Sequence, residues 1–318
     1  MRVTVLILSL DEAPMLERSL PAALAQEPRP QVVVVDNACT DATASLADRH
    51  GARRIRLDTR RSYAAAINEG IAVTGGDDAV LLLNADCFLA PGFLAAALPH
   101  LGAPHVGVVA PKLVRVAGAQ GSRALGQIDT AGMVIDRRRK NGLVGHGRPS
   151  HAYARGARVF GADGAAALYR RETLIDCALD DREVLDEDME LWASDADLAW
   201  RAQLLGWSAV YEPAAVAEHV RTYSPSTRAE MGEADRRLQF RNRYLMMLKN
   251  DTPAALARDL PWVAGYELAA LGHVLLRERH LLEGYREAWA LRHAARRRRR
   301  LIQGRRRRSA PLGIRAPA

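Results

Sequence analysis

The chain of 318 residues is 48% hydrophobic and 26% charged, with a formal net charge of +8. This length and composition exclude a disordered or fibrous protein and supply enough apolar side chains for one large core or two modest ones. The three cysteines, Cys39, Cys87 and Cys177, are widely spaced and form no Cys-x-x-Cys pair, which argues against a disulfide framework and a zinc site. We therefore expect a protein of the reducing cytoplasm.

The N-terminal half alternates short apolar runs with helical patterns. The runs are rich in Val, Ile and Leu without polar alternation, which is typical of parallel strands covered on both faces. The first run is too short for a signal peptide and lacks a small-residue cleavage site, so we expect a buried strand there. We predict strands at 3–8, 32–35, 54–57 and 79–83, and helices at 13–26, 41–49 and 63–74.

This repeated βα pattern predicts an α/β fold with an open, doubly wound, mostly parallel sheet. Ligands of such sheets bind beyond the carboxyl ends of the strands. Asp11 and Thr40 or Asp41 are available as N-caps of the first two helices.

The middle of the chain is less regular. Residues 112–160 hold many Gly and Arg with only brief apolar stretches such as 132–135, which predicts loops and antiparallel excursions around a site. Beyond them we predict a strand at 165–169, a helix at 195–205 that ends at Gly206, and a strand that begins at 208–211.

The C-terminal part reads as helical, at 230–249 and 261–299. We divide the chain into a domain at 1–225, a helical region at 226–300 and a basic, disordered tail at 301–318. Residues 261–276 are apolar, but Glu267 and His273 interrupt them, and the run is shorter than the roughly 20 residues that span a bilayer. With Trp262 and Tyr266 in it, this stretch either packs against the domain or lies in a membrane interface.

The positive charge is concentrated at the C-terminus. Residues 292–318 hold eleven Arg and no Asp or Glu, which leaves 34 basic and 37 acidic residues in the rest of the chain. The run Arg296 to Arg308 could meet an anionic membrane surface, or it could be a solvated helix end. We do not expect a nucleic-acid partner.

Two Asp residues directly follow predicted strands, Asp36 after 32–35 and Asp86 after 79–83. A carboxylate at the end of a buried strand is costly unless it binds something. Asp36 could accept hydrogen bonds from a nucleotide, and Asp86 offers the hard oxygen ligand that Mg²⁺ or Mn²⁺ takes together with phosphates. The structural alternative is that Thr40 and Asp41 only cap a helix and that Asp86 does the same.

Five motifs in order resemble family 2 glycosyltransferases of the GT-A fold, with the rhamnosyltransferase-like group as the nearest type. The resemblance spans roughly residues 3–250 and implies a nucleotide-sugar-binding sheet with a C-terminal helical extension. The motifs are Val35-Asp36-Asn37 with Asp41 beyond it, Ala64 to Gly70, Leu83-Asn84-Ala85-Asp86, Gly161 to Arg171, and Asp195 to Arg201 followed by Gly206-Trp207.

The resemblance implies a donor site and a metal. Asp36 would hold the nucleotide base or ribose, with Ser9 lining the same pocket. Asn84-Ala85-Asp86 takes the place of the family's DxD motif, with Asn84 in the first acidic position. Asp86 would bind the Mg²⁺ or Mn²⁺ that bridges the phosphates. His219 matches a position that can complete metal or diphosphate binding, although an ordinary strand-end histidine is an equal alternative.

The resemblance also implies a catalytic residue. Asp195 would be the general base, although Ser194 stands where the family usually has Glu. Asp163 would contact the acceptor, the small residues around Gly161 would let the backbone approach a substrate, and the helical pair Asp197 and Arg201 would position the helix start. The full set of substrate-binding candidates is Ser9, Asp36, Asn37, Asn68, Asn84, Gly161, Asp163, Asp197 and Arg201.

The implied reaction moves a sugar from a UDP- or dTDP-sugar to a glycan or lipid-linked glycan hydroxyl, with inversion, at the cytoplasmic face of the membrane. A pyrophosphorylase would need a Gly-rich basic loop after the first strand, and a Rossmann dehydrogenase would need G-x-G-x-x-G there; residues 9–16 hold neither. A non-enzyme alternative stays open, in which an impaired nucleotide-sugar site accompanies an Arg tail that binds anionic surfaces.

Overall fold

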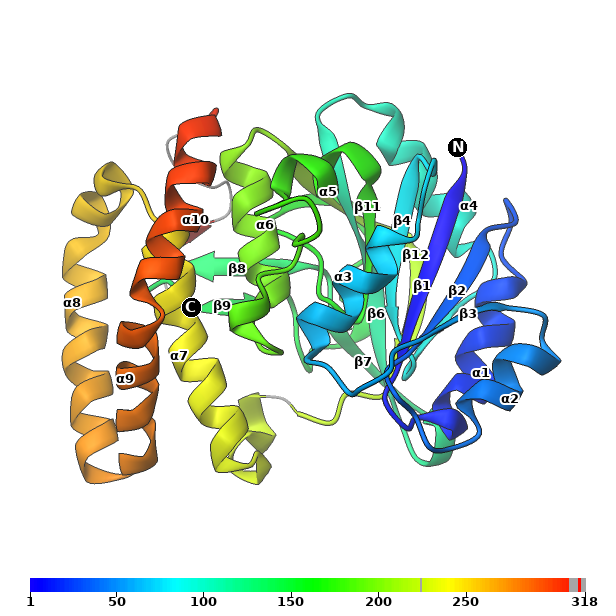
Figure 1. Cartoon of the computed structure of the whole chain (residues 1–318), viewed down its shortest axis with the longest axis horizontal. Coiled ribbons are helices and arrows are strands. Elements are labelled where there is room, and N and C mark those ends of the chain that lie inside the picture. The colour runs from blue at the N-terminus through cyan, green and yellow to red at the C-terminus, as the bar shows by residue number, and fades with distance from the viewer. Residues whose placement is uncertain (224, 309–313, 316–318) are drawn as a thin grey trace.

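The computed structural model describes residues 1–223, 225–308 and 314–315 (Figure 1). The strands of its central sheet are β1 (Val3–Ser9), β2 (Gln31–Asp36), β3 (Arg53–Arg56), β4 (Ala79–Asn84), β5 (Cys87–Leu89), β6 (Val106–Ala117), β7 (Arg123–Thr130), β10 (Ala157–Val159), β11 (Ala166–Arg170) and β12 (Ser208–His219). A second, three-stranded sheet consists of β13 (Ile314–Arg315), β8 (Met133–Asp136) and β9 (Asn141–Leu143).

The central sheet has the order β10-β12-β6-β11-β4-β1-β2-β3, with β5 beside β12 and β7 beside β6. The strands β3, β2, β1 and β4 are parallel, as are β6 and β12. Between these two groups, β11 runs antiparallel to both of its neighbours. The predicted α/β sheet is confirmed, and the region at 112–160 does contain the expected antiparallel excursion, the pair β6 and β7.

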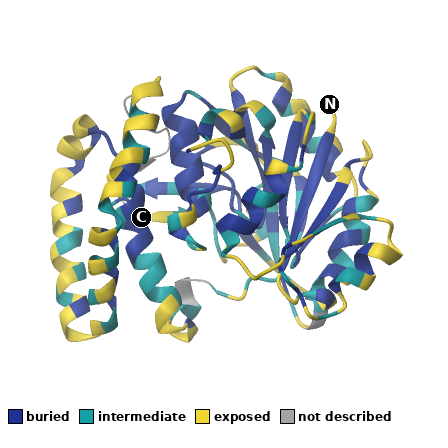
Figure 2. Cartoon of the chain, viewed as in Figure 1, coloured by how far each residue is buried: buried dark blue, intermediate teal, exposed yellow. Residues whose placement is uncertain are grey.

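Helices cover both faces of this sheet because the side chains of each strand alternate between two cores. On β1, Val5 and Ile7 enter the core shared with α1 (Ala13–Leu24), α2 (Thr43–Arg49) and α4 (Phe93–Ala97). Leu6 and Leu8 enter the core shared with α3 (Tyr63–Ala72), α5 (Arg171–Cys177) and α6 (Ser194–Leu204). Figure 2 shows the strands buried between helices whose outer faces are exposed.

The register places the predicted site residues at one edge. Ser9 pairs with Asp36 at the carboxyl ends of β1 and β2, and Leu8 pairs with Asn84 at the end of β4. The strand β12 is much longer than the predicted 208–211, and its last residue, His219, pairs with Cys87 of β5. This extension brings His219 beside the turn that contains Asp86.

Four helices form the C-terminal region, namely α7 (Glu233–Asn250), α8 (Pro253–Leu276), α9 (Leu282–Ala290) and α10 (Arg292–Arg305). The prediction of one helix over 261–299 is wrong. The chain reverses after Leu276 because Glu278 accepts hydrogen bonds from Arg228 and Arg236, which fix the turn against the α7 side of the region. The start of α8 lies eight residues earlier than predicted, where the Thr252 side chain caps the helix.

The predicted disorder from residue 301 is also wrong for the residues described there. The helix α10 continues to Arg305, and the backbone N–H groups of Arg307 and Arg308 donate to the carbonyl oxygen of Leu204. The remainder of that predicted tail, residues 309–313 and 316–318, lies outside the described residues. Among the helices of the described part, each is too short or too polar to cross a bilayer.

Candidate active site

A line of alternating charges runs from Asp86 into the protein. His219 Nε2 lies 3.4 Å from Asp86 Oδ1, and His219 Nδ1 lies 2.8 Å from Asp129 Oδ2. Arg221 Nε donates to both oxygens of Asp129, at 2.7 and 2.9 Å, and its Nη2 donates to Asp163 Oδ2 at 2.7 Å. Tertiary structure thus joins the ends of β4, β7 and β12 and the segment before β11.

Electrostatics fix the charges along this line. Burial lowers the pKa of His219, but the hydrogen bond to Asp129 and the nearby Asp86 carboxylate outweigh it and raise the pKa to about 9. Burial opposes ionisation of Asp129, yet hydrogen bonds with His146 and His219 and the charge of Arg221 hold its pKa well below the usual range. Asp129 is therefore an anion that orients the His219 ring.

The first turn of α6 carries Asp195, which remains partly exposed. Asp195 Oδ2 accepts the backbone N–H of Gly164 at 3.0 Å, and Oδ1 accepts that of Ala196 at 2.7 Å. Burial and the Asp163 carboxylate raise the pKa of Asp195, and the two N–H donors lower it. The net pKa is about 6. A carboxylate with such a pKa is well suited to accept a proton near neutral pH.

Tyr63 and Gly164 lie next to Asp195. Tyr63 Oη donates to the Gly164 carbonyl oxygen at 3.3 Å. A Cβ atom at Gly164 would lie 3.3 Å from Tyr63 Oη, which is tight, and 3.6 Å from Asp195 Oδ2, which is an ordinary contact distance. Gly164 lets the backbone approach the Asp195 carboxylate closely.

The residues around Asp86 fit a divalent cation. Asp86 Oδ1 is buried and lacks a hydrogen-bond donor among the residues that the structure describes. Glu12 adds a second carboxylate nearby, and burial together with the negative charge of Asp86 raises its pKa to about 7. An unsatisfied carboxylate oxygen beside an imidazole nitrogen suits a cation that completes its shell with phosphate oxygens.

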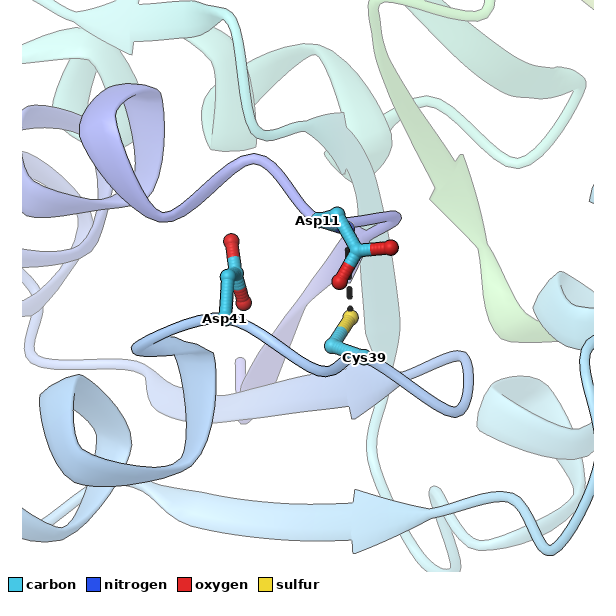
Figure 3. Close-up of side chains that lie close together, drawn as sticks. All are labelled: Asp11, Cys39 and Asp41. Carbon is cyan, nitrogen blue, oxygen red and sulfur yellow. Dashed lines mark hydrogen bonds between the residues drawn. The ribbon is translucent and has the colours of Figure 1, made fainter.

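A second acidic group, Asp11, Cys39 and Asp41, has ligand atoms within 4.8 Å of one another (Figure 3). Its carboxylate oxygens are already occupied, since Asp41 accepts the N–H groups of Ala13 and Thr43, and Asp11 accepts that of Thr40. Burial also raises the pKa of the Cys39 thiol. This cluster ties two loops together and does not resemble a cation site.

The same contacts settle the predicted caps. The Asp41 carboxylate accepts the first backbone N–H of α1 and also the first backbone N–H of α2. The predicted cap Asp11 does not stand at the N-cap position of α1, which is occupied by Glu12.

The structure buries all three residues of the predicted donor pocket, Ser9, Asp36 and Asn37. The Ser9 hydroxyl is buried against Thr43, and Asn37 exchanges two hydrogen bonds with the backbone of Arg61. The Asp36 side chain is fully buried beneath the guanidinium groups of Arg54 and Arg56. Direct contact between Asp36 and a donor would require these arginines to move.

Four further candidates are buried and held by contacts within the protein. Asn68 is buried and bonds to the backbone of Val184 and Leu185. Gly161 is buried, and a Cβ atom there would lie 2.3 Å from the Cβ atom of Ala199 in α6, so its small size serves helix packing.

The pair Asp197 and Arg201 is fully buried at 2.8 Å. Asp197 also bonds to Lys249 and Asn250 of α7, so the pair joins α6 to the C-terminal helices.

The structure thus gathers Asp86, Asp163, Asp195 and His219 at one edge, with Asn84 partly exposed beside Asp86. Sequence reasoning missed Glu12, Tyr63, Asp129 and Arg221. Of these four, only Arg221 could have been predicted from the sequence. It follows His219 by two residues, and this spacing places both side chains on one side of an extended chain. Asp129 gave no such signal, since it lies 90 residues from His219 in the chain.

Comparisons with known proteins give matches to glycosyltransferases. The family described as Glycosyl transferase family 2 matches residues 4–177, more than half of the chain. The succinoglycan biosynthesis protein ExoU of Rhizobium meliloti is 32% identical over 132 residues, which cover 40% of this chain and 37% of that protein. An uncharacterised glycosyltransferase of Mycobacterium tuberculosis is 36% identical over 100 residues, 31% of this chain and 43% of that protein. The matches span less than half of each relative.

Solved structures show the same fold. The mannosyltransferase PcManGT of Pyrobaculum calidifontis, solved with GDP-Man and Mn²⁺, has a TM-score of 0.55 at 21% identity, covering 95% of this chain and 85% of that one. Residues 1–349 of TarS from S. aureus give a TM-score of 0.58 at 16% identity, covering 96% and 89%. With the predicted motifs, the GT-A sheet and the family match in agreement, the chain belongs to glycosyltransferase family 2.

Proposed function

We propose that this protein is an inverting glycosyltransferase that moves a sugar from a UDP- or dTDP-sugar to a hydroxyl group of a glycan or lipid-linked glycan. Rhamnose is the first sugar to test, because the motifs are nearest to the rhamnosyltransferase-like group. The observation that carries the proposal is Asp195, an accessible carboxylate with a pKa raised to about 6, held at the same sheet edge as Asp86 and His219.

Asp86 and His219 would hold the divalent cation. Mn²⁺ in the PcManGT complex and UDP-GlcNAc in a TarS complex support a metal and a nucleotide sugar as partners. A bound cation would neutralise the charge that develops on the departing diphosphate. Since Nε2 of His219 can coordinate only when it is unprotonated, the raised pKa of this group means that cation binding would release a proton. Asp129 keeps the ring aimed at Asp86 in either state.

Asp195 would take the proton of the acceptor hydroxyl. As its carboxylate accepts that proton, the hydroxyl oxygen forms a bond to the anomeric carbon, and the bond between this carbon and the diphosphate oxygen breaks. The electron pair of the broken bond leaves with the nucleotide diphosphate. One displacement from the opposite face inverts the anomeric configuration. The Gly164 N–H and Tyr63 fix Asp195 and its surroundings during the step.

A donor screen tests the proposed function. We expect nucleotide release from a UDP- or dTDP-sugar in the presence of a glycan acceptor, and we expect chelation of Mg²⁺ and Mn²⁺ to suppress it. The measurement is the release of UDP or dTDP across a donor panel, with each metal added back separately. The absence of release with every donor, acceptor and metal would favour the non-enzyme alternative.

The matched variant for this screen is Asp86→Ala, compared with Asp48→Ala on the exposed side of α2. We expect Asp86→Ala to weaken Mn²⁺ binding about 10–100-fold in a titration followed by electron paramagnetic resonance, and Asp48→Ala to leave it unchanged. Equal Mn²⁺ affinity in both variants would refute Asp86 as the ligand.

The pH dependence of transfer tests the role of Asp195. Because the base must be ionised, kcat/KM measured with saturating metal should rise about tenfold per pH unit below an apparent pKa near 6 and level off above it. Replacing Asp163 by Asn removes a negative charge that raises the pKa of Asp195, so the acid limb should move to lower pH. A pH profile of kcat/KM in wild type and Asp163→Asn, with circular dichroism confirming the fold at each pH, checks both. An acid limb that moves to higher pH in this variant contradicts the assignment.

A further inference from the structure

The helix α8 turns an apolar face away from the protein. The positions Ala257, Leu260, Ala264, Leu268, Leu271 and Leu275 recur at steps of three or four residues, so they share one side of the helix. Leu260, Leu268, Leu271 and Leu275 are 55%, 74%, 43% and 46% exposed. We call these six residues the α8 face. Figure 1 shows α8 as the outermost element at one end of the molecule, and Figure 2 shows its outer side exposed.

The three charged residues of α8, Arg258, Asp259 and Glu267, are all engaged in ion pairs within the protein, so the α8 face itself carries no charge. Asp259 is fully buried and pairs with Arg139 at 2.9 Å. Glu267 accepts hydrogen bonds from Arg243 and Tyr244 at 2.6 Å each. The inward side of α8 is thus held by polar contacts to the domain, and the apolar side is left for another partner.

A pocket of about 410 Å³ adjoins the start of α8. It lies between α7, α8 and α10, and its lining includes the apolar residues Leu248, Pro253 and Leu256 together with Arg296 and Arg299. Arg299 is anchored there by hydrogen bonds to the carbonyl oxygens of Leu248 and Asp251. Apolar walls beside two guanidinium groups suit an acyl chain and its phosphate.

The surrounding surface is strongly basic. Residues 253–308 contain fourteen Arg and only five Asp or Glu. Each of these five acids already pairs with an Arg or His, whereas Arg296, Arg297 and Arg300 are exposed on α10. The Arg run is partly structural, because Arg298 pairs with Glu183 at 2.7 Å and Asp186 at 3.0 Å, but its exposed members leave positive charge on α10, and Arg296 lines the pocket at the start of α8 together with Leu256.

We propose that the α8 face docks in the interface of an anionic phospholipid membrane, with the helix lying along the surface. At 24 residues α8 is about 36 Å long, enough for its leucines to enter the headgroup boundary over several turns. Exposed Arg residues near the bilayer add attraction to anionic lipid. This surface goes beyond the proposed sugar transfer and does not depend on it.

A second copy of the chain fits the same face less well. A two-fold contact through the α8 face would use the same patch of both subunits, so the partner copy would bring a second basic surface and no complementary acidic one. Facing arginines repel one another, whereas an anionic membrane attracts them.

Vesicle flotation of the full chain tests the proposal. We expect wild type to float with vesicles of equal parts phosphatidylcholine and phosphatidylglycerol, and not with phosphatidylcholine alone. The double variant Leu268→Glu/Leu271→Glu should reduce the bound fraction at least about tenfold. The matched control is Ile175→Glu, whose side chain is 61% exposed on α5, and it should bind as wild type does.

The variant Arg296→Glu/Arg297→Glu should weaken binding about fivefold or more per residue at low salt, and less at high salt. Thermal melts must show that the leucine variant folds, which its exposed positions favour. Wild type that ignores anionic vesicles, or a folded leucine variant that binds equally well, overturns the proposal. So does a wild-type dimer that the leucine variant converts to a monomer in light scattering. Nucleotide release with a soluble acceptor should be the same in the leucine variant and wild type.

Discussion

Replacing Asp195 by Asn should lower kcat for sugar transfer by about 10²- to 10⁴-fold, because the amide cannot accept the proton of the acceptor hydroxyl. The change is nearly isosteric, and the amide oxygen can still accept the N–H of Gly164. Donor and metal binding should therefore persist, since the Asp86 and His219 contacts do not pass through Asp195. The measurement is single-turnover transfer to acceptor, with donor affinity determined in parallel.

The matched control is Asp181→Asn, at an exposed position outside the site. It should transfer at the wild-type rate, and both variants should show wild-type circular dichroism. If folded Asp195→Asn retained full transfer activity, the base would have to be another group. A loss of donor affinity equal to the loss of rate would place Asp195 in donor binding instead.

Replacing Lys249 by Met should cost about 3–5 kcal/mol of unfolding free energy, because it removes one partner of a buried ion cluster. Lys249 is fully buried and lies in contact with Asp186 and 2.9 Å from Asp197. Without Lys249, Arg201 still pairs with Asp197 and Arg298 still pairs with Asp186, so each carboxylate keeps one cation. The expected loss therefore comes from the missing Lys249 ammonium group. Urea denaturation of the two proteins measures the difference.

The control removes a comparable pair from the surface. Arg286→Met breaks the exposed pair with Glu283 and should change stability by less than about 0.5 kcal/mol. In the double variant Lys249→Met/Asp186→Asn, part of the loss should be recovered, since the second change removes a buried carboxylate that has lost one of its two cations. Equal stability of Lys249→Met and Arg286→Met would show that the cluster contributes little to the fold.

Local sequence was sufficient for the parallel half of the sheet. The apolar runs that form β1, β2 and β4 match the predicted strands within one residue at each end, because strands buried on both faces need continuous apolar side chains. It failed between α8 and α9, where the helical pattern continues but the ion pairs of Glu278 with Arg228 and Arg236 fix a turn. Those partners lie more than 40 residues away, outside the reach of any local pattern.

The predicted site residues also fall into two groups, those that lie at the site and those that are bonded within the fold. Asp86 and Asp195 were found because each stands at the end or start of an element with a recognisable motif around it. Asp36, Asn68 and Arg201 looked equally suitable, yet each is buried and bonded to other parts of the protein. A polar residue in a motif can serve the fold or the substrate, and its tertiary contacts, which the sequence does not show, separate these uses.

By itself, the sequence determined the fold class and the family resemblance, since these depend on periodicity and on residues close together in the chain, and it singled out Asp86 and Asp195, whose roles stay predictions. Only the tertiary structure decided the rest. It brings Asp129 and Arg221 to the site and buries Asp197 in an ion cluster. It also leaves the apolar side of α8 exposed. The physical reason is that burial and ion pairing are set by segments far apart in the chain, and these decide whether a charge is neutralised inside the protein or remains available to a ligand.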